Sequence, residues 1–159
     1  MLPAQKWFPL NTDRLLLREF ALGDEDAIHE YGGDPLLSQY ASWGPNSRED
    51  THTGLIKRLD EQLVWPRGEV TLALELLAER KVIGAIRLGI SDEENDTADF
   101  GFVVNRRYWN QGYATEASRA ILHVAFHTLK TRDAPRRPPP ERRVSKGRVA
   151  RFVCLWLAL

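Results

Sequence analysis

The segment Gln111–Thr115 has the composition of an anion-binding helix start. The first backbone N–H groups of a helix have no partner inside the helix and carry a partial positive charge. Gly112 and Ala114 have no side chain large enough to cover these donors, so a phosphate or diphosphate group can approach them. Arg106 and Arg107 precede the segment and would add full positive charges. We therefore expect this segment to bind a phosphorylated ligand.

The neighbouring residues predict the elements that hold this segment in place. Phe100, Phe102 and Val104 alternate with other residues, which is typical of a half-buried strand. After a polar turn at 105–110, apolar residues recur at spacings of three and four, which predicts an amphipathic helix. The members of this stripe are Ala114, Ala117, Ile121, Val124, Ala125 and Leu129. A strand thus leads through a turn directly into the candidate anion site.

Two common phosphate-binding motifs are absent, because the chain has neither G-x-G-x-x-G after a strand nor G-x-x-x-x-G-K-[ST]. What remains is the string Y-W-N-Q-G-Y-A-T-E-A at 108–117. This string resembles the acetyl-coenzyme A loop, Q/R-x-x-G-x-G/A, of the GNAT N-acetyltransferases, in the branch that acetylates ribosomal-protein N-termini. Trp109 stands where the wider family has Gln or Arg, which is usual in this branch. The opening L-N-T-D-R-L-L-L-R-E-F at 10–20 also resembles that branch, so the resemblance runs over about residues 10–130.

The resemblance implies acetyl-coenzyme A as co-substrate, with no metal. It implies that Phe102–Val104 offer backbone N–H groups to the thioester carbonyl, as an oxyanion donor does. It also places the cofactor phosphates at the turn and the helix start. The expected cofactor-binding residues are Phe102, Val103, Val104, Arg107, Asn110, Gln111, Gly112, Tyr113, Ala114 and Thr115.

Three residues are candidates for acceptor chemistry. Asp99 stands where relatives carry Glu, and its carboxylate could take the ammonium proton of an amine through water. The alternative is a solvated charge on the outer face of a strand. Tyr40 and Trp43 fall in the region that shapes the acceptor pocket in relatives, although loop aromatics also serve to cover a core.

Other side chains give weaker signals. His123 and His127 lie four residues apart on the predicted helix, but no third ligand is close in sequence, so no metal site is expected. Cys154 is the only cysteine, which fits a reducing, cytoplasmic setting. No run of apolar residues reaches the ~20 that a membrane helix needs.

The order of predicted elements indicates an α+β fold. The resemblance implies the GNAT form of this class, with a mixed, largely antiparallel sheet flanked by helices. We expect strands at 14–20, 69–77, 82–90 and 97–104 and a short helix from Gly23. We also expect a helix over 48–63 with Leu55, Leu59 and Leu63 on one face. Residues 35–47 read as a loop. The resemblance implies that residues 1–130 form the acetyltransferase domain.

Residues 131–159 are a different kind of sequence. They are rich in Arg and contain Pro138-Pro139-Pro140, which cannot pass through a central strand. We therefore expect the chain to lack the family's normal C-terminal strands and to end in an atypical, poorly ordered basic tail. A one-nucleotide frameshift at Pro138–Arg148 permits the peptide H-P-R-N-V-A-S-A-R-V, which resembles the family's own segment there. We hypothesise a frameshifted end, which sequencing of the coding DNA tests.

The sequence thus predicts an acetyl-coenzyme A dependent N-acetyltransferase acting on a primary amine, either a protein N-terminus or a small molecule. The chain would be a monomer or homodimer, without membrane contact. Residues 1–129 carry 13 Lys and Arg against 20 Asp and Glu, which favours a cationic acceptor. One alternative is an impaired remnant that binds the cofactor weakly or not at all. Nucleic-acid binding by the basic tail is the weakest alternative, since aromatic residues do not alternate with its charges.

Overall fold

The computed structural model describes residues 8–39, 43–64, 67–92 and 97–130. These residues form one five-stranded sheet in the order β1-β2-β3-β4-β5, with every neighbouring pair antiparallel. The strands are β1 (Leu10–Asn11), β2 (Leu15–Arg18), β3 (Glu69–Leu76), β4 (Lys81–Asp92) and β5 (Thr97–Val104). This confirms the predicted α+β class and the predicted start and end of β5.

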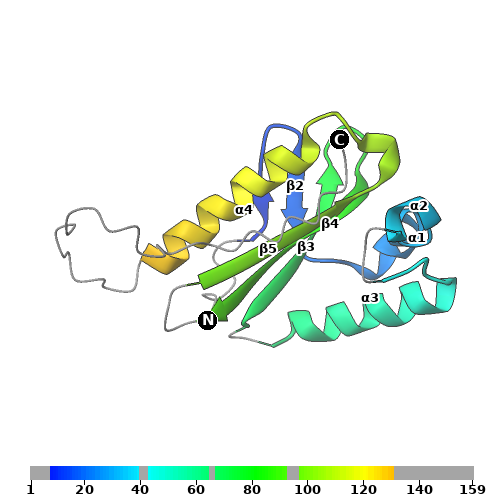
Figure 1. Ribbon diagram of the computed structural model, residues 1–159, viewed down its shortest axis with the longest axis horizontal. Helices are drawn as coiled ribbons and strands as arrows, with labels where there is room; N and C mark the ends of the chain where they lie inside the picture. Colours follow the sequence, from blue (N-terminus) through cyan, green and yellow to red (C-terminus); the bar gives the residue numbers. More distant parts are fainter. Residues whose placement is uncertain (1–7, 40–42, 65–66, 93–96, 131–159) are drawn as a thin grey trace.

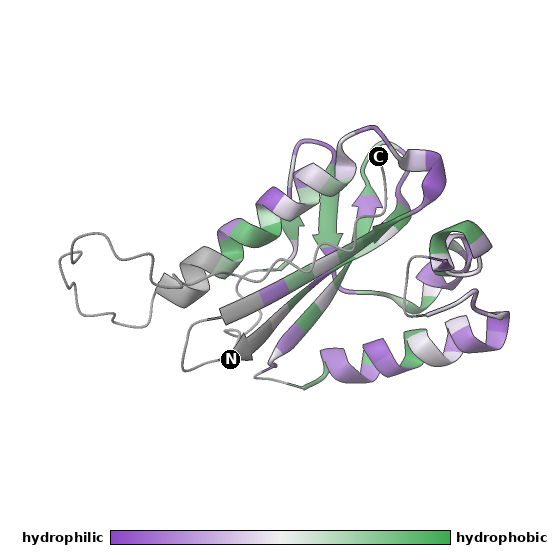
Figure 2. Cartoon of the chain, in the orientation of Figure 1, coloured by the Kyte–Doolittle hydropathy of each residue, from purple (hydrophilic) through white to green (hydrophobic). Residues whose placement is uncertain are grey.

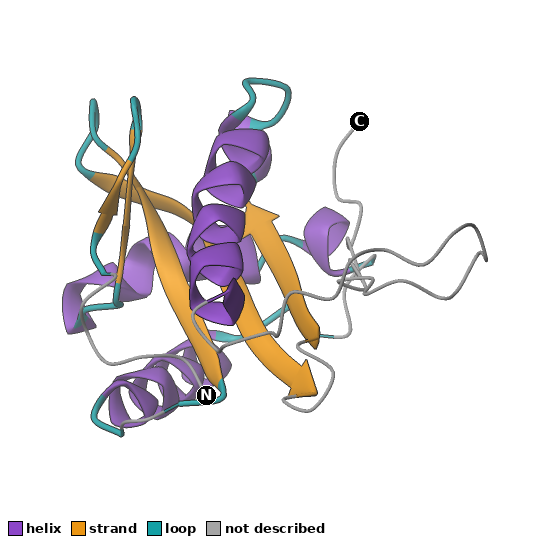
Figure 3. Cartoon of the chain, turned by 90° about the vertical axis from the view of Figure 1, so that its left-hand side faces the viewer, coloured by secondary structure: helices purple, strands orange, loops and turns teal. Residues whose placement is uncertain are grey.

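Helices cover both faces of the sheet (Figure 1). The helical elements are η1 (Leu22–Asp24), α1 (Glu25–Gly32), α2 (Pro35–Ser38), α3 (Arg48–Gln62), η2 (Arg106–Tyr108) and α4 (Tyr113–Lys130). The long helix α4 crosses one face, and α1 to α3 lie on the other, so α4 is in front of the strands when the molecule is turned (Figure 3). In the described part of the chain, no helix is both long and apolar enough to cross a membrane.

Two buried clusters follow from the alternation along the strands. On the α4 side, Leu72, Ile86 and Ile121 are fully buried and belong to the larger cluster. On the other side, a smaller cluster includes Leu55 of α3 and Ala85 of β4. Successive side chains of a strand point to opposite faces, so β3, β4 and β5 contribute to both clusters. Figure 2 shows the result, with apolar strands between helices whose outer surfaces are hydrophilic.

Helix α3 begins where its capping residues predict. The Ser47 side chain accepts a hydrogen bond from the Asp50 N–H, and the Asp50 carboxylate accepts one from the Ser47 N–H at 2.9 Å. This reciprocal pair satisfies two donors that a helix start leaves open. Leu55 is buried and Leu59 half-buried, as expected. Leu63 does not share this face, which corrects the prediction, because it follows the last helical residue and is 83% exposed.

The segment 35–47 is not wholly a loop, which corrects another prediction. A short helix, α2, begins at Pro35, where Asp34 accepts a hydrogen bond from the Leu36 N–H at 2.9 Å. Proline at the first helical position, after an Asp cap, is a recognised start signal. The expectations for Tyr40 and for residues 131–159, with the missing strands and the frameshift, lie outside the described residues.

The pairing of β4 with β5 depends on the absence of a side chain at Gly84. A Cβ atom there would lie 2.2 Å from the Val103 carbonyl oxygen, and that backbone cannot move without shifting β5. We expect Gly84→Ala to lower the free energy of unfolding by about 2–3 kcal/mol. Gly101→Ala, on the facing strand, is the matched control, since a Cβ there meets nothing within 4 Å. Urea unfolding of both variants checks this, and equal stabilities would contradict it.

Candidate active site

The mouth of helix α4 is a tight turn that leaves backbone donors open. Asn110 and Gly112 have left-handed φ angles of 58° and 80°, and the first helical residue follows. Within the described chain, no side chain or carbonyl accepts a hydrogen bond from the N–H groups at 112–115. The helix dipole adds partial positive charge at these donors. Nothing in the described structure therefore blocks an anion from this helix start.

An ionic cluster that we call the latch ties this helix start to the β1–β2 turn. Glu116 accepts hydrogen bonds from the Thr12 hydroxyl at 2.6 Å and from the Arg14 N–H at 2.9 Å. The Arg14 guanidinium donates to Glu116 at 2.7 Å and to the Gln111 carbonyl at 2.9 Å. It also lies over the Tyr113 ring, with 4.4 Å between Cζ and the ring centroid. The latch thus holds the turn by the carbonyl group of Gln111 and does not use the N–H groups at 112–115.

The latch should make stability depend on pH. Partial burial opposes ionisation of Glu116, but the hydrogen bonds from Thr12 and Arg14 outweigh it and lower the pKa of Glu116. A depressed carboxyl pKa stabilises the fold above the unfolded-state pKa, and this is lost as pH falls through the folded-state value. Glu116→Gln is expected to cost about 1 kcal/mol at neutral pH and to lose less stability than the wild type near pH 3.

Urea unfolding at the two pH values measures this difference. Glu49→Gln is a suitable control, because Glu49 is an exposed acid in the first turn of α3. A Glu116→Gln variant whose stability falls as steeply with acid as that of the wild type would contradict the role of the latch.

The two arginines before the turn point away from the helix start. Arg107 donates to Glu30 of α1 at 2.6 Å, and Arg106 donates to Asp34 at 3.0 Å. Glu30 also pairs with Lys81 at 2.5 Å, and the bond to Lys81 lowers the pKa of Glu30. The Arg107 side chain is 76% exposed, so its ion pair is weak and can exchange for another anion.

The outer edge of β5 carries the backbone groups predicted to face a thioester. The Asn105 N–H donates to the Ile83 carbonyl at 2.7 Å, and hydrogen-bonded pairs alternate along an antiparallel ladder. By this alternation the backbone N–H groups of Phe102 and Val104 point away from β4, whereas that of Val103 points toward it. The Trp109 indole donates to the outward carbonyl of Val104 at 2.7 Å, which ties this edge to the turn before α4.

Asp99 lies in a row of charges on the face opposite α4. Arg87 of β4 donates both to Asp99 and to Glu69 of β3, and the three side chains gather over Gly89, which has no side chain to displace them. Burial opposes the charge of Arg87, but Glu69 and Asp99 outweigh it and raise the pKa of Arg87. Asp99 is therefore partnered rather than simply solvated, and only 22% of its side chain is exposed.

The remaining predicted residues divide between core and surface. Tyr113 is buried in the larger cluster, and Tyr108 donates to Glu79 at 2.6 Å, a bond that raises the pKa of Tyr108 to about 12. Gln111 is exposed and donates to the Arg107 carbonyl at 3.3 Å. Trp43 is 37% exposed. No group of three or more metal-ligating side chains occurs among the residues described.

Sequence reasoning missed Arg14, Glu116 and Arg87. Glu116 does lie in the string that carried the resemblance, but its partners lie about a hundred residues earlier. No sequence motif surrounds Arg87. Only the strand register shows that the carboxylates of Glu69 and Asp99 lie beside it.

Among the described residues, β5 is the last strand of the sheet, and it leads through a turn to a helix whose first N–H groups have no acceptor. The chain matches the family described as "Acetyltransferase (GNAT) domain" over residues 14–146. It belongs to that family, which confirms the resemblance noted in the sequence. GNAT acetyltransferases use acetyl-coenzyme A, and this chain is an N-acetyltransferase by family.

Individual proteins that are similar to this chain are also described as acetyltransferases. The chain is 33% identical over 121 residues to the uncharacterized N-acetyltransferase YnaD of Bacillus subtilis (strain 168), covering 76% of this chain and 66% of YnaD. A GNAT-family acetyltransferase from Bacillus anthracis superposes with a TM-score of 0.64 and 30% identity, covering 76% and 68%. A putative ribosomal-protein-serine acetyltransferase from Vibrio cholerae has a TM-score of 0.65 and 20% identity, covering 77% and 69%, which shows a shared fold. The chain thus spans about two thirds of the length of these proteins.

Proposed function

We propose that this chain binds the diphosphate of acetyl-coenzyme A at the mouth of α4 and transfers the acetyl group to a primary amine. The observation that carries the proposal is the set of open N–H groups at 112–115, beside a turn fixed by Arg14. Backbone donors at a helix start hold a diphosphate by hydrogen bonds and by the dipole. Asn110 and Gln111 belong to the same turn, and an Arg107 released from Glu30 would add a charge.

The outer edge of β5 supplies the second part of the site. The backbone N–H groups of Phe102 and Val104, directed away from β4, suit the oxygen of a thioester carbonyl as charge develops on it. Val103 uses its N–H toward β4, so we assign it a packing role. Because Trp109 bonds to the Val104 carbonyl, the diphosphate site and this edge stay in fixed relation.

Asp99 would serve as the general base. An ammonium acceptor first loses one proton and then attacks the thioester carbon as a neutral amine. The carbon–sulfur bond breaks, and the second proton, which the nitrogen loses as the amide forms, goes to the thiolate. Asp99 receives the ammonium proton through water, and Arg87 holds the carboxylate in place. The acceptor is a protein N-terminus or a small-molecule amine, and Tyr40 and Trp43 stay candidates for contacts to it.

The test separates cofactor binding from transfer. Calorimetry should show binding of acetyl-coenzyme A and none of acetyl-pantetheine, which lacks the diphosphate. A thiol-release assay with a panel of amines then measures transfer. Equal binding of the two thioesters, or no binding of either, would overturn the proposal. Binding without transfer to any amine would instead identify a remnant that has kept only the cofactor site.

A further inference from the structure

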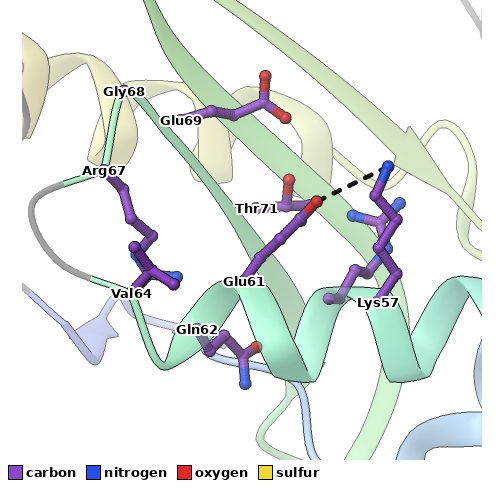
Figure 4. Close-up of a pocket in the computed structure, with 9 residues that line it drawn as sticks. Lys57, Glu61, Gln62, Val64, Arg67, Gly68, Glu69 and Thr71 are labelled. Carbon is purple, nitrogen blue, oxygen red and sulfur yellow. Dashed lines mark ion pairs between the residues drawn. The ribbon is translucent and has the colours of Figure 1, made fainter.

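A groove between α3 and the start of β3 lies on the same face of the sheet as Asp99. Its volume is about 590 Å³. The lining includes Lys57, Arg58 and Glu61 from α3, and Arg67, Glu69 and Thr71 from the sheet side. Figure 4 shows side chains of the helix and of the strand directed into the space between them. The groove is therefore large enough for a small peptide or metabolite, and most of its lining is charged.

A row of paired charges leads from the groove to the proposed base. Glu69 lines the groove, and Arg87 joins it to Asp99. In the strand register, Glu69 lies opposite Gly89, which lies opposite Asp99. Glu69 and Asp99 are thus two strand spacings apart, which is a distance of about 10 Å. A molecule bound in the groove can therefore extend along the row to place an amine at Asp99.

Arg58 is the distinctive cation of the groove. Its guanidinium stacks on the Phe20 ring, with Cζ 5.5 Å from the centroid. Among the described residues it has no carboxylate within ion-pair distance, whereas Lys57 pairs with Glu61 at 3.8 Å and Arg67 pairs with Glu19. A guanidinium held on an aromatic face keeps its fork of N–H donors for a planar anion such as a carboxylate.

We infer that the acceptor is an amine that also carries a carboxylate several bonds away, as in a short peptide. Its carboxylate pairs with Arg58, and its amine extends toward Glu69 and Asp99. This inference rests on the proposed function, and it refines the expectation of a cationic acceptor. The excess of acidic side chains in residues 1–129 attracts the ammonium group of the acceptor, while Arg58 pairs with its carboxylate in the groove. An acceptor without a carboxylate would leave Arg58 without an anion.

The test uses matched acids and amides as probes. Trialanine and trialanine amide differ only in the terminal carboxylate, and an extended tripeptide spans about 10 Å. Calorimetry without cofactor should show that the wild-type protein binds trialanine about tenfold more tightly than its amide. Alanine and alaninamide form a second pair, which distinguishes a small acceptor from a peptide.

Arg58→Gln should remove this preference for the acid, and Arg58→Lys should reduce it while keeping the charge. Arg48→Gln is the matched control, since Arg48 lies on the same helix outside the groove and pairs with Asp26. Equal binding of acid and amide by the wild type, no binding of either, or a preference that survives in Arg58→Gln would overturn the inference. Acid-selective binding without acetyl transfer would instead count against the proposed function, and transfer without acid preference would count against the inference alone.

Discussion

Gly112→Asp is expected to weaken the binding of acetyl-coenzyme A by about a thousandfold. The substitution places a carboxylate at the open N–H groups of 112–115, where the diphosphate is proposed to bind. Like charges brought together in a binding site cost several kcal/mol. The helix itself should tolerate the change, because Asp is a favourable residue at a helix start and accepts left-handed backbone better than most. Calorimetry with acetyl-coenzyme A measures the loss.

Gly112→Asn is the control for this result, because it has almost the same shape as Asp without the charge. A Cβ at this position lies 3.5 Å from the Arg14 guanidinium, which is ordinary contact, so both side chains fit at their base. The Asn variant should lose at most about tenfold, from the side chain covering part of the site. If the two variants bind acetyl-coenzyme A equally well, the diphosphate does not bind at this helix start.

Asp99→Asn is expected to lower kcat by about a hundredfold or more, with little change in the KM for acetyl-coenzyme A. A positioned general base contributes roughly 10²–10⁴-fold, and the amide of Asn cannot accept the ammonium proton. Asn keeps one oxygen for Arg87, so the row of charges over Gly89 keeps most of its packing. The measurement is the initial rate of thiol release at saturating acetyl-coenzyme A.

The pH dependence of kcat distinguishes a general base from a carboxylate that only supports the structure. Above the pKa of an α-amino acceptor, about 8, the amine is already neutral and needs no base. The gap between the wild type and Asp99→Asn should therefore narrow as pH rises from 6 to 9. Asp26→Asn, a change at a carboxylate that is 88% exposed on α1, should match the wild type throughout. A constant gap would show that Asp99 acts on structure rather than on the proton.

Much of the fold is readable from local patterns. The sequence predicts a helix from residue 48, where the Ser47 cap does start α3, and the alternation ending at Val104 predicts β5. The open start of α4 is readable too, because Gly112 and the small residues after it act within one helical turn. Such predictions succeed because neighbours along the chain decide caps, turns and the burial period.

Other features depend on which strands lie side by side. The link from Glu69 through Arg87 to Asp99 needs the register of three strands, and no spacing in the sequence encodes it. Arg107 illustrates the same point, since its charge beside the turn suggested a phosphate contact, yet the fold directs it to Glu30 of α1.

The sequence by itself determined the strand–turn–helix with its open N–H groups, because those groups depend only on the backbone of a few consecutive residues. Tertiary structure alone decided what surrounds them. The latch brings Arg14 and Thr12 to Glu116 across about a hundred residues, and the groove brings Arg58 of α3 onto the same face as Asp99 of β5. Ion pairs of this kind form only after the sheet has aligned distant segments, so their partners are set by packing and register rather than by local sequence.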